Sequence, residues 1–177
     1  MANSIFMPFI RKGGAALAKR LLNGTVGYEP GMGFFWRKVI DFSKNPGAIG
    51  AVALEADTST TVALHTAFPN EGDLFPSNVI VHGASLYLES VVDDSASALT
   101  AATVSLGDAG AGTGLLNAVA VHTALGLKAT QGAESVFHIE AAFEPQLIIA
   151  TTNANGEDLN TGRFGIRIFF TPHPLYA

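Results

Sequence analysis

Histidine is the residue type in this sequence best suited to metal binding or proton transfer. His65, His82, His122 and His138 fall in segments with strand patterns, and His173 lies between two prolines. Two or three of them converging on one sheet could hold a metal ion, but no pair has the i, i+2 spacing that places two ligands on one strand face. We therefore expect interior or interface histidines, a structural His173, and no metal site.

Two acidic stretches carry oxygen ligands that calcium would accept. One is Asp93-Asp94, and the other is Glu157-Asp158 within a loop rich in asparagine. Neither stretch has the EF-hand order of ligands and glycine. Asx side chains commonly close turns by accepting backbone hydrogen bonds, so turns are the expected structure at both places.

Signatures of catalysis are missing from the sequence. The glycine-rich segment 107–114 has no lysine after it and is followed by a strand pattern, which predicts a hairpin loop and not a phosphate site. Glu89 and Glu140 have no supporting groups for acid–base chemistry. G-x-S-x-G, H-E-x-x-H and cysteine are all absent. We expect no catalytic residue, no cofactor and no enzymatic activity.

The segment 78–92 has the clearest strand pattern near the middle of the chain. Alternation is broken at Gly83, which indicates a bulge, and then resumes with an apolar face at every second residue. Residues 100–107 alternate in the same way after a short Asp/Ser break. We interpret the two as the central hairpin of an antiparallel sheet.

Further strands are expected at intervals along the chain, with no long helical period after the N-terminus. A second hairpin is expected between 146–152 and 163–171, through a loop with Asn-Gly and Thr-Gly steps. The fold class that follows is all-β: an antiparallel β-sandwich, jelly-roll-like, with a short N-terminal basic arm. The remaining expected strands are 34–42, 51–55, 60–67, 115–123 and 134–141.

The composition indicates a protein that contacts other subunits. Apolar residues make up 48% of the chain and charged residues only 14%, against roughly 25% in an average soluble domain. Some of that apolar surface is expected to meet another subunit. An export signal would place its positive charges before an apolar run, and here the basic residues follow the apolar ones. No apolar run is long enough to span a bilayer, so a soluble, non-exported protein is expected.

The charge is unevenly distributed. Residues 1–23 hold four of the ten basic residues and none of the fifteen acidic ones, so this segment carries +4 and the rest carries −9. We divide the chain into an arm with its connector, 1–30, and a β-sandwich body, 31–177. The acidic body disfavours non-specific nucleic-acid binding, whereas the basic arm suits an acidic partner surface, lipid headgroups or a phosphate backbone. Its candidate interaction residues are Phe6, Phe9, Ile10, Arg11, Lys12, Leu17, Lys19, Arg20 and Leu21.

Three interpretations of the arm stay open. It makes at most two or three helical turns, which is too short to be stable alone in water. It is therefore either a frayed terminus, a segment that docks on a neighbouring subunit, or a helix on a membrane surface.

The order of segments between residues 60 and 119 carries a family resemblance. VALHTAFP leads to a polar loop, NVIVHGASLYLES follows, and after an Asp/Ser linker ATVSLGDAG leads through glycines to LLNAV; GRFGIRIFFTP closes the body. This pattern resembles small β-sandwich head-associated virion proteins of tailed bacteriophages. The resemblance excludes the arm. It implies a decoration or minor capsid protein in the virion, with no cofactor and no catalytic residues.

The leading hypothesis is a non-enzymatic virion structural protein, assembled in the host cytoplasm, that forms a homo-oligomer and anchors to the capsid through its arm. Its partners are copies of itself and the major capsid protein. The alternative is a receptor- or glycan-binding β-sandwich module of a virion fibre or tail, using the loops 68–77, 107–114 and 153–162. A third hypothesis is a membrane-active structural protein in which 1–23 inserts into an envelope.

Overall fold

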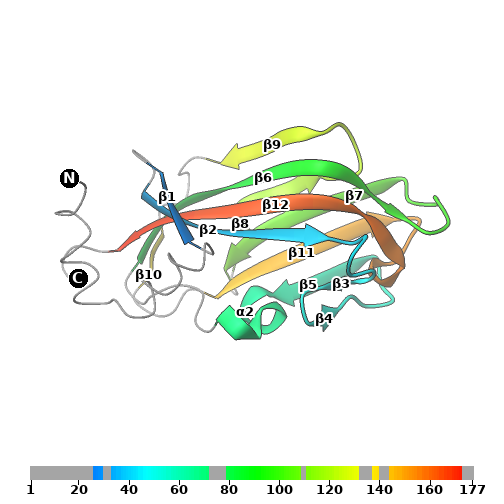
Figure 1. Cartoon of the computed structure of the whole chain (residues 1–177), viewed down its shortest axis with the longest axis horizontal. Helices are drawn as coiled ribbons and strands as arrows, with labels where there is room; N and C mark the ends of the chain where they lie inside the picture. Colours follow the sequence, from blue (N-terminus) through cyan, green and yellow to red (C-terminus); the bar gives the residue numbers. More distant parts are fainter. Residues whose placement is uncertain are drawn as a thin grey trace.

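The computed structural model describes residues 26–29, 33–71, 79–108, 111–131, 137–139 and 144–172, and within these the chain forms two packed antiparallel sheets (Figure 1). The first has six strands: β1 (Val26–Glu29), β2 (Gly33–Asp41), β6 (Val79–Asp94), β9 (Gly126–Gln131), β10 (Phe137–Ile139) and β12 (Leu159–Pro172). The second has four: β5 (Ser59–Ala63), β7 (Ala101–Asp108), β8 (Ala111–Ala120) and β11 (Pro145–Thr152).

Short elements connect these strands. A small two-stranded sheet joins β3 (Ala48–Ile49) to β4 (Val52–Ala53). One helical turn, α2 (Leu64–Ala67), follows β5 directly. Two 3₁₀ turns complete the described elements, η1 (Pro69–Glu71) and η2 (Gly156–Asp158).

The strand order is that of a jelly roll. Among the main strands, β2, β12, β6 and β9 are neighbours in one sheet, and β5, β11, β7 and β8 in the other. When these eight strands are numbered in chain order, one sheet has the order 1-8-3-6 and the other 2-7-4-5. Consecutive strands therefore lie mostly in opposite sheets. The prediction of an all-β, jelly-roll-like antiparallel sandwich is confirmed. The predicted basic arm lies outside the described residues.

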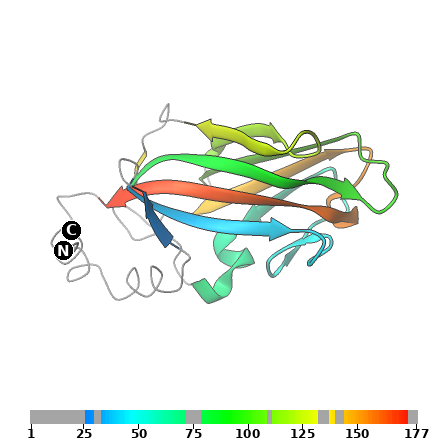
Figure 2. The same ribbon diagram turned by 45° about the horizontal axis from the view of Figure 1, so that its top comes forward.

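The two sheets lie face to face (Figure 2). The core lies between them and consists of apolar side chains from both. On β12 the residues Phe164, Ile166 and Ile168 alternate with outward ones and are fully buried. From the other sheet Leu147 and Ile149 of β11 meet the same cluster. Both strands therefore follow the period-two alternation that the sequence shows.

Both predicted hairpins are wrong. β6 pairs with β12, β9 and β10, whereas β7 pairs with β11 and β8 in the other sheet. Likewise β11 pairs with β5 and β7, while β12 pairs with β2 and β6. An inward-facing alternation is identical whether two consecutive strands pair or face each other across a core, so the pattern alone does not distinguish the two arrangements.

Several predicted strands have different bounds. The strand expected over 60–67 ends at Ala63, and α2 buries Leu64 and Ala67 three residues apart on one helical face. The segment 51–55 contributes only the short β4, and the described part of 134–141, Phe137–Ile139, forms β10. The strand expected at 115–123 is β8, shifted toward the N-terminus. β9, with the sequence GLKATQ, was not predicted, because it has no continuous apolar alternation.

The bulge predicted at Gly83 is confirmed. Gly83 pairs with Phe169 and Val81 pairs with Phe170, so one residue of β6 is left out of the register. The backbone at Gly83 has a φ of 151°. The extra residue keeps Val81 and Ala84, on opposite sides of the bulge, both in the core.

Candidate interaction surface

The histidines do not form a metal site within the part of the chain that the structure describes. His65 lies in α2, not in a strand as predicted, and is exposed. His82 Nε2 lies 2.7 Å from Thr171 Oγ1, and His122 Nδ1 accepts a hydrogen bond from the Ala102 amide at 3.0 Å. No group of three or more potential ligands gathers among these residues. His138 lies in β10, and His173 is outside the described residues.

The two acidic stretches close turns, as expected. Asp94 Oδ1 accepts hydrogen bonds from the amides of Ala98 and Leu99, at 2.8 and 3.1 Å, where the chain crosses from β6 to the other sheet. In η2 the Asn155 amide donates to Asp158 Oδ2 at 3.2 Å. The carboxylates of Asp94 and Asp158 are therefore used within the fold.

Asp94 is a buried carboxyl group whose charged form is stabilised by the backbone. Burial acts to raise its pKa, but the amides of Leu99 and Ala98, with those of Ala96 and Asp94 itself, lower the pKa below the ordinary value of 3.8. Because the folded-state pKa is the lower one, the ionised group stabilises the fold at neutral pH. That contribution is lost as the pH falls below about 4.

Asp94→Asn should therefore lower the midpoint of thermal unfolding at neutral pH. The difference from the unchanged protein should shrink as the pH falls below about 4, because the wild-type carboxyl group is then protonated as well. Thermal unfolding followed by circular dichroism over a pH series measures this. A difference that stays constant down to acid pH would contradict the assignment.

The other candidates for chemistry have structural roles or lie outside the described residues. The glycine-rich segment joins β7 to β8 in a hairpin in which Asp108 pairs with Ala111, as predicted. Glu89 forms an ion pair with Arg163, with Oε2 3.0 Å from Nε. Glu140 lies outside the described residues. The arm residues from Phe6 to Leu21 lie there too, so their role stays a prediction.

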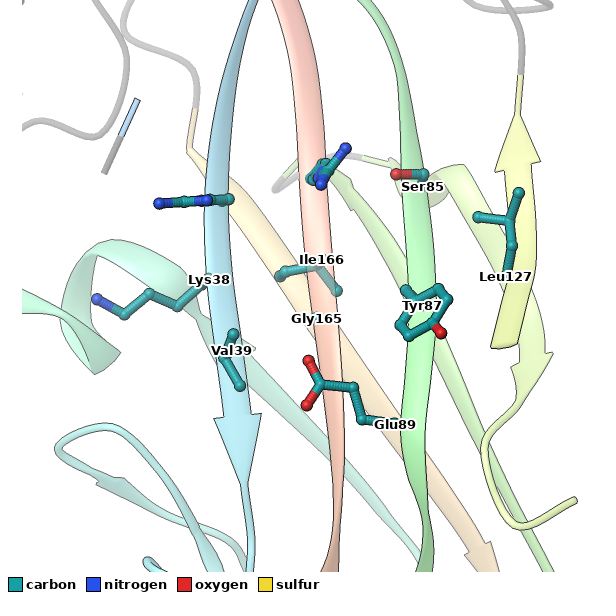
Figure 3. Close-up of a pocket in the computed structure, with 10 residues that line it drawn as sticks. Lys38, Val39, Ser85, Tyr87, Glu89, Leu127, Gly165 and Ile166 are labelled. Carbon is teal, nitrogen blue, oxygen red and sulfur yellow. The ribbon is translucent and has the colours of Figure 1, made fainter. Parts of the chain in front are cut away.

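The outer face of the six-stranded sheet carries a row of four positions in register. Gly165 of β12 pairs with Val39 of β2 on one side and with Tyr87 of β6 on the other, and Tyr87 pairs with Leu127 of β9. Figure 3 shows these residues side by side across the strands. We call Val39, Gly165, Tyr87 and Leu127 the apolar row.

The apolar row is exposed and hollowed. The exposed fractions of its three side chains are 45% for Val39, 52% for Tyr87 and 65% for Leu127. Among the described residues the other large exposed apolar side chains are Val91, further along β6, and Leu125, just before β9. A hollow of about 270 Å³ lies over Gly165. Such a patch is typical of a contact surface.

Charged side chains border the apolar row along the strands. Arg37 and Arg167 pair across β2 and β12 on one side of it, and the Arg167 guanidinium lies 5.1 Å from the ring centre of Phe35. On the other side Arg163 lies between Glu89 and Asp41, at 3.0 and 4.0 Å. The apolar centre therefore has a polar rim on two sides, as protein interfaces do.

Lys38 lies beside the row but turns toward α2. Its Nζ lies 4.3 Å from the ring centre of Phe68. Desolvation by burial lowers the pKa of Lys38. Five of the six basic residues of 24–177 belong to strands of the six-stranded sheet, and the sixth, Lys44, follows β2. The positive charge of the acidic body is therefore concentrated on the sheet that carries the apolar row.

Comparisons with known proteins show no family. No family model matches the chain, and no curated protein matches it. Among solved structures, a chain of the "Cyanophage Pam1 capsid asymmetric unit" is similar, with a TM-score of 0.43 and 20% sequence identity over 82% of this chain and 91% of that chain. No helix in the described residues is long and apolar enough to cross a membrane.

Sequence reasoning did not find the apolar row. On β12 Gly165 lies between the buried Phe164 and Ile166 and so belongs to the outward face, and Tyr87 is the outward residue between Leu86 and Leu88. A large apolar side chain at an outward position was the available signal. What the pattern could not supply was the pairing of β2, β12, β6 and β9, which brings the four positions together.

Proposed function

We propose that this protein is a non-enzymatic structural component of a virion, a decoration or minor capsid protein that works by contact with neighbouring subunits. The apolar row carries the proposal, since an exposed apolar patch with a polar rim is a common form of protein contact surface. The jelly roll is a fold used by viral capsid proteins, among others, although fold by itself does not determine function. The segment order that resembles phage head-associated proteins points the same way.

In this proposal the arm supplies attachment and the body supplies lateral contact. The arm carries +4 and the remainder −9, so the arm suits an acidic surface of a capsid or a neighbouring body. A short helical segment that is unstable alone in water becomes ordered when its apolar side chains are buried against a partner.

Deleting residues 1–23 should leave a folded body that no longer joins particles. The particle-bound fraction is expected to fall by about tenfold or more, because many copies attach together and each loses its anchor. Co-sedimentation of purified protein with particles lacking it measures the effect. Circular dichroism and thermal unfolding establish that the shortened chain is folded.

A matched variant separates charge from apolar contact within the arm. Replacing Arg11, Lys12, Lys19 and Arg20 by glutamine keeps the length and the apolar residues. If attachment is electrostatic, this variant binds weakly and wild-type binding falls with added salt. Full incorporation of the shortened chain would overturn the anchoring role. Flotation of the arm with liposomes would point instead to membrane contact.

Recognition of a glycan is the second candidate, and Tyr87 is the observation that favours it. Its half-exposed ring lies beside the hollow over Gly165, with the polar groups of Glu89 and Ser85 near it. Sugars stack on such rings. Saturable binding on a glycan array that is lost in Tyr87→Ala would favour this function. The site would then be the sheet face and not the loops predicted from the sequence.

A further inference from the structure

The glycine at the centre of the apolar row is not required by the fold of its own chain. Gly165 is not among the glycines with a positive φ. A Cβ built there would meet only the carbonyl oxygen of Lys38, at 3.9 Å. Glycine weakens a strand interior, and where backbone geometry does not need it, it often marks the close approach of another group.

We propose that the apolar row binds the same row of a second copy of this chain, in an isologous pair. The two-fold axis runs parallel to the strands, between β12 and β6. This pairing makes the proposed function more specific. It rests on that function in one respect, that this face is a contact surface.

The row is self-complementary about that axis. Across the strands its order is Val39, Gly165, Tyr87, Leu127. Rotation brings the reversed order of the second copy opposite it, so that Tyr87 of each copy meets the hollow over Gly165 of the other. Leu127 of each copy likewise meets Val39 of the other. Each contact then occurs twice, as a two-fold interface requires.

Charges agree with the same arrangement. Beyond the row, Arg163 lies on β12 and Glu89 on β6, so the axis places Arg163 of each copy opposite Glu89 of the other. On the other side, Arg167 is placed opposite Ser85, its own cross-strand neighbour. The arrangement therefore puts neither of these arginines opposite another basic residue, and opposite charges meet at the rim.

Exchange of the tyrosine and the glycine tests the pairing directly. Gly165→Tyr places two rings opposite each other, and Tyr87→Gly places two hollows opposite each other. Each change alone should raise the dissociation constant of the dimer by about tenfold or more. The double variant, Gly165→Tyr with Tyr87→Gly, restores one ring opposite one hollow and should return the constant to near its original value.

Sedimentation velocity over a dilution series of the purified full chain gives these constants without any particles present. Thr61→Tyr is the matched control, because it adds a tyrosine to an exposed position on the other sheet; it should leave the constant unchanged. Thermal unfolding establishes that each variant is folded. A wild-type monomer at every concentration overturns the pairing. So does a double variant as weak as the two single ones, which would mean a contact without this symmetry.

Failure of this pairing is distinguishable from failure of the proposed function. A chain that joins particles through its arm and stays monomeric in solution keeps the structural role and loses the isologous pair. A chain that dimerises through the row and never joins particles does the reverse.

Discussion

Replacing Phe164 by alanine should lower the free energy of unfolding by roughly 3–5 kcal/mol. Phe164 is fully buried on β12, and its ring centre lies 6.3 Å from that of Phe42, also fully buried. Its backbone neighbours are Ile40 of β2 and Leu88 of β6. Truncation therefore leaves a cavity beside β12 of the six-stranded sheet. Because β12 is paired with β2 and β6, the surrounding backbone has little freedom to move and fill that cavity.

The effect is large against a total stability of about 5–15 kcal/mol for a typical domain. Urea unfolding followed by tryptophan fluorescence measures it, since Trp36 belongs to the same core cluster. Leu125→Ala is the matched control, because Leu125 is 63% exposed and lies outside the apolar row; it should change stability by about 0.5 kcal/mol or less. Equal losses in the two variants would contradict the core described above.

The sequence allowed the faces of the strands to be predicted but not their partners. On β12 the alternation placed Phe164 and Ile168 inward and Arg163 and Arg167 outward, as the structure has them. Those preferences are local, because each side chain is sorted by burial alone. The choice of neighbour depends on how the connections cross the sandwich. The turn closed by Asp94 sends β7 to the opposite sheet, where the sequence analysis expected a hairpin.

The same distinction explains why the candidate surface was missed. Val39 and Leu127 are 88 residues apart in the chain, and only the pairing of β2 with β12, of β12 with β6 and of β6 with β9 aligns them. β9 was itself not expected, because GLKATQ has little apolar alternation. Its one large apolar residue, Leu127, faces outward. Apolar residues normally indicate a strand by facing the core, whereas Leu127 forms part of the exposed apolar row.

Gly162→Ala should destabilise the protein more than Gly126→Ala, although the two glycines have almost the same φ angle. Their φ angles are 107° and 106°. Positive φ strains any residue with a Cβ, by about 1–3 kcal/mol. At Gly126 nothing lies within 4 Å of the added Cβ, so this strain is the whole expected effect.

At Gly162 the strain is joined by a clash with the backbone. The added Cβ would lie 2.7 Å from the carbonyl oxygen of Val91 and still closer to Cα of Val92. Gly162 also accepts the amide hydrogen bond of Phe42 at 2.9 Å, so β12 cannot move away without breaking a contact with β2. Overpacking of this kind adds about 1–3 kcal/mol or more.

Urea unfolding of the two variants isolates the clash, because the contribution of backbone strain is common to both. The difference between them should be at least about 1 kcal/mol, with Gly162→Ala the less stable. Since Val92 is buried on β6 and its amide donates to the carbonyl of Val121, the displacement should reach the link between the two sheets. Equal stability of the two variants would mean that β6 and β12 do not approach each other at this point.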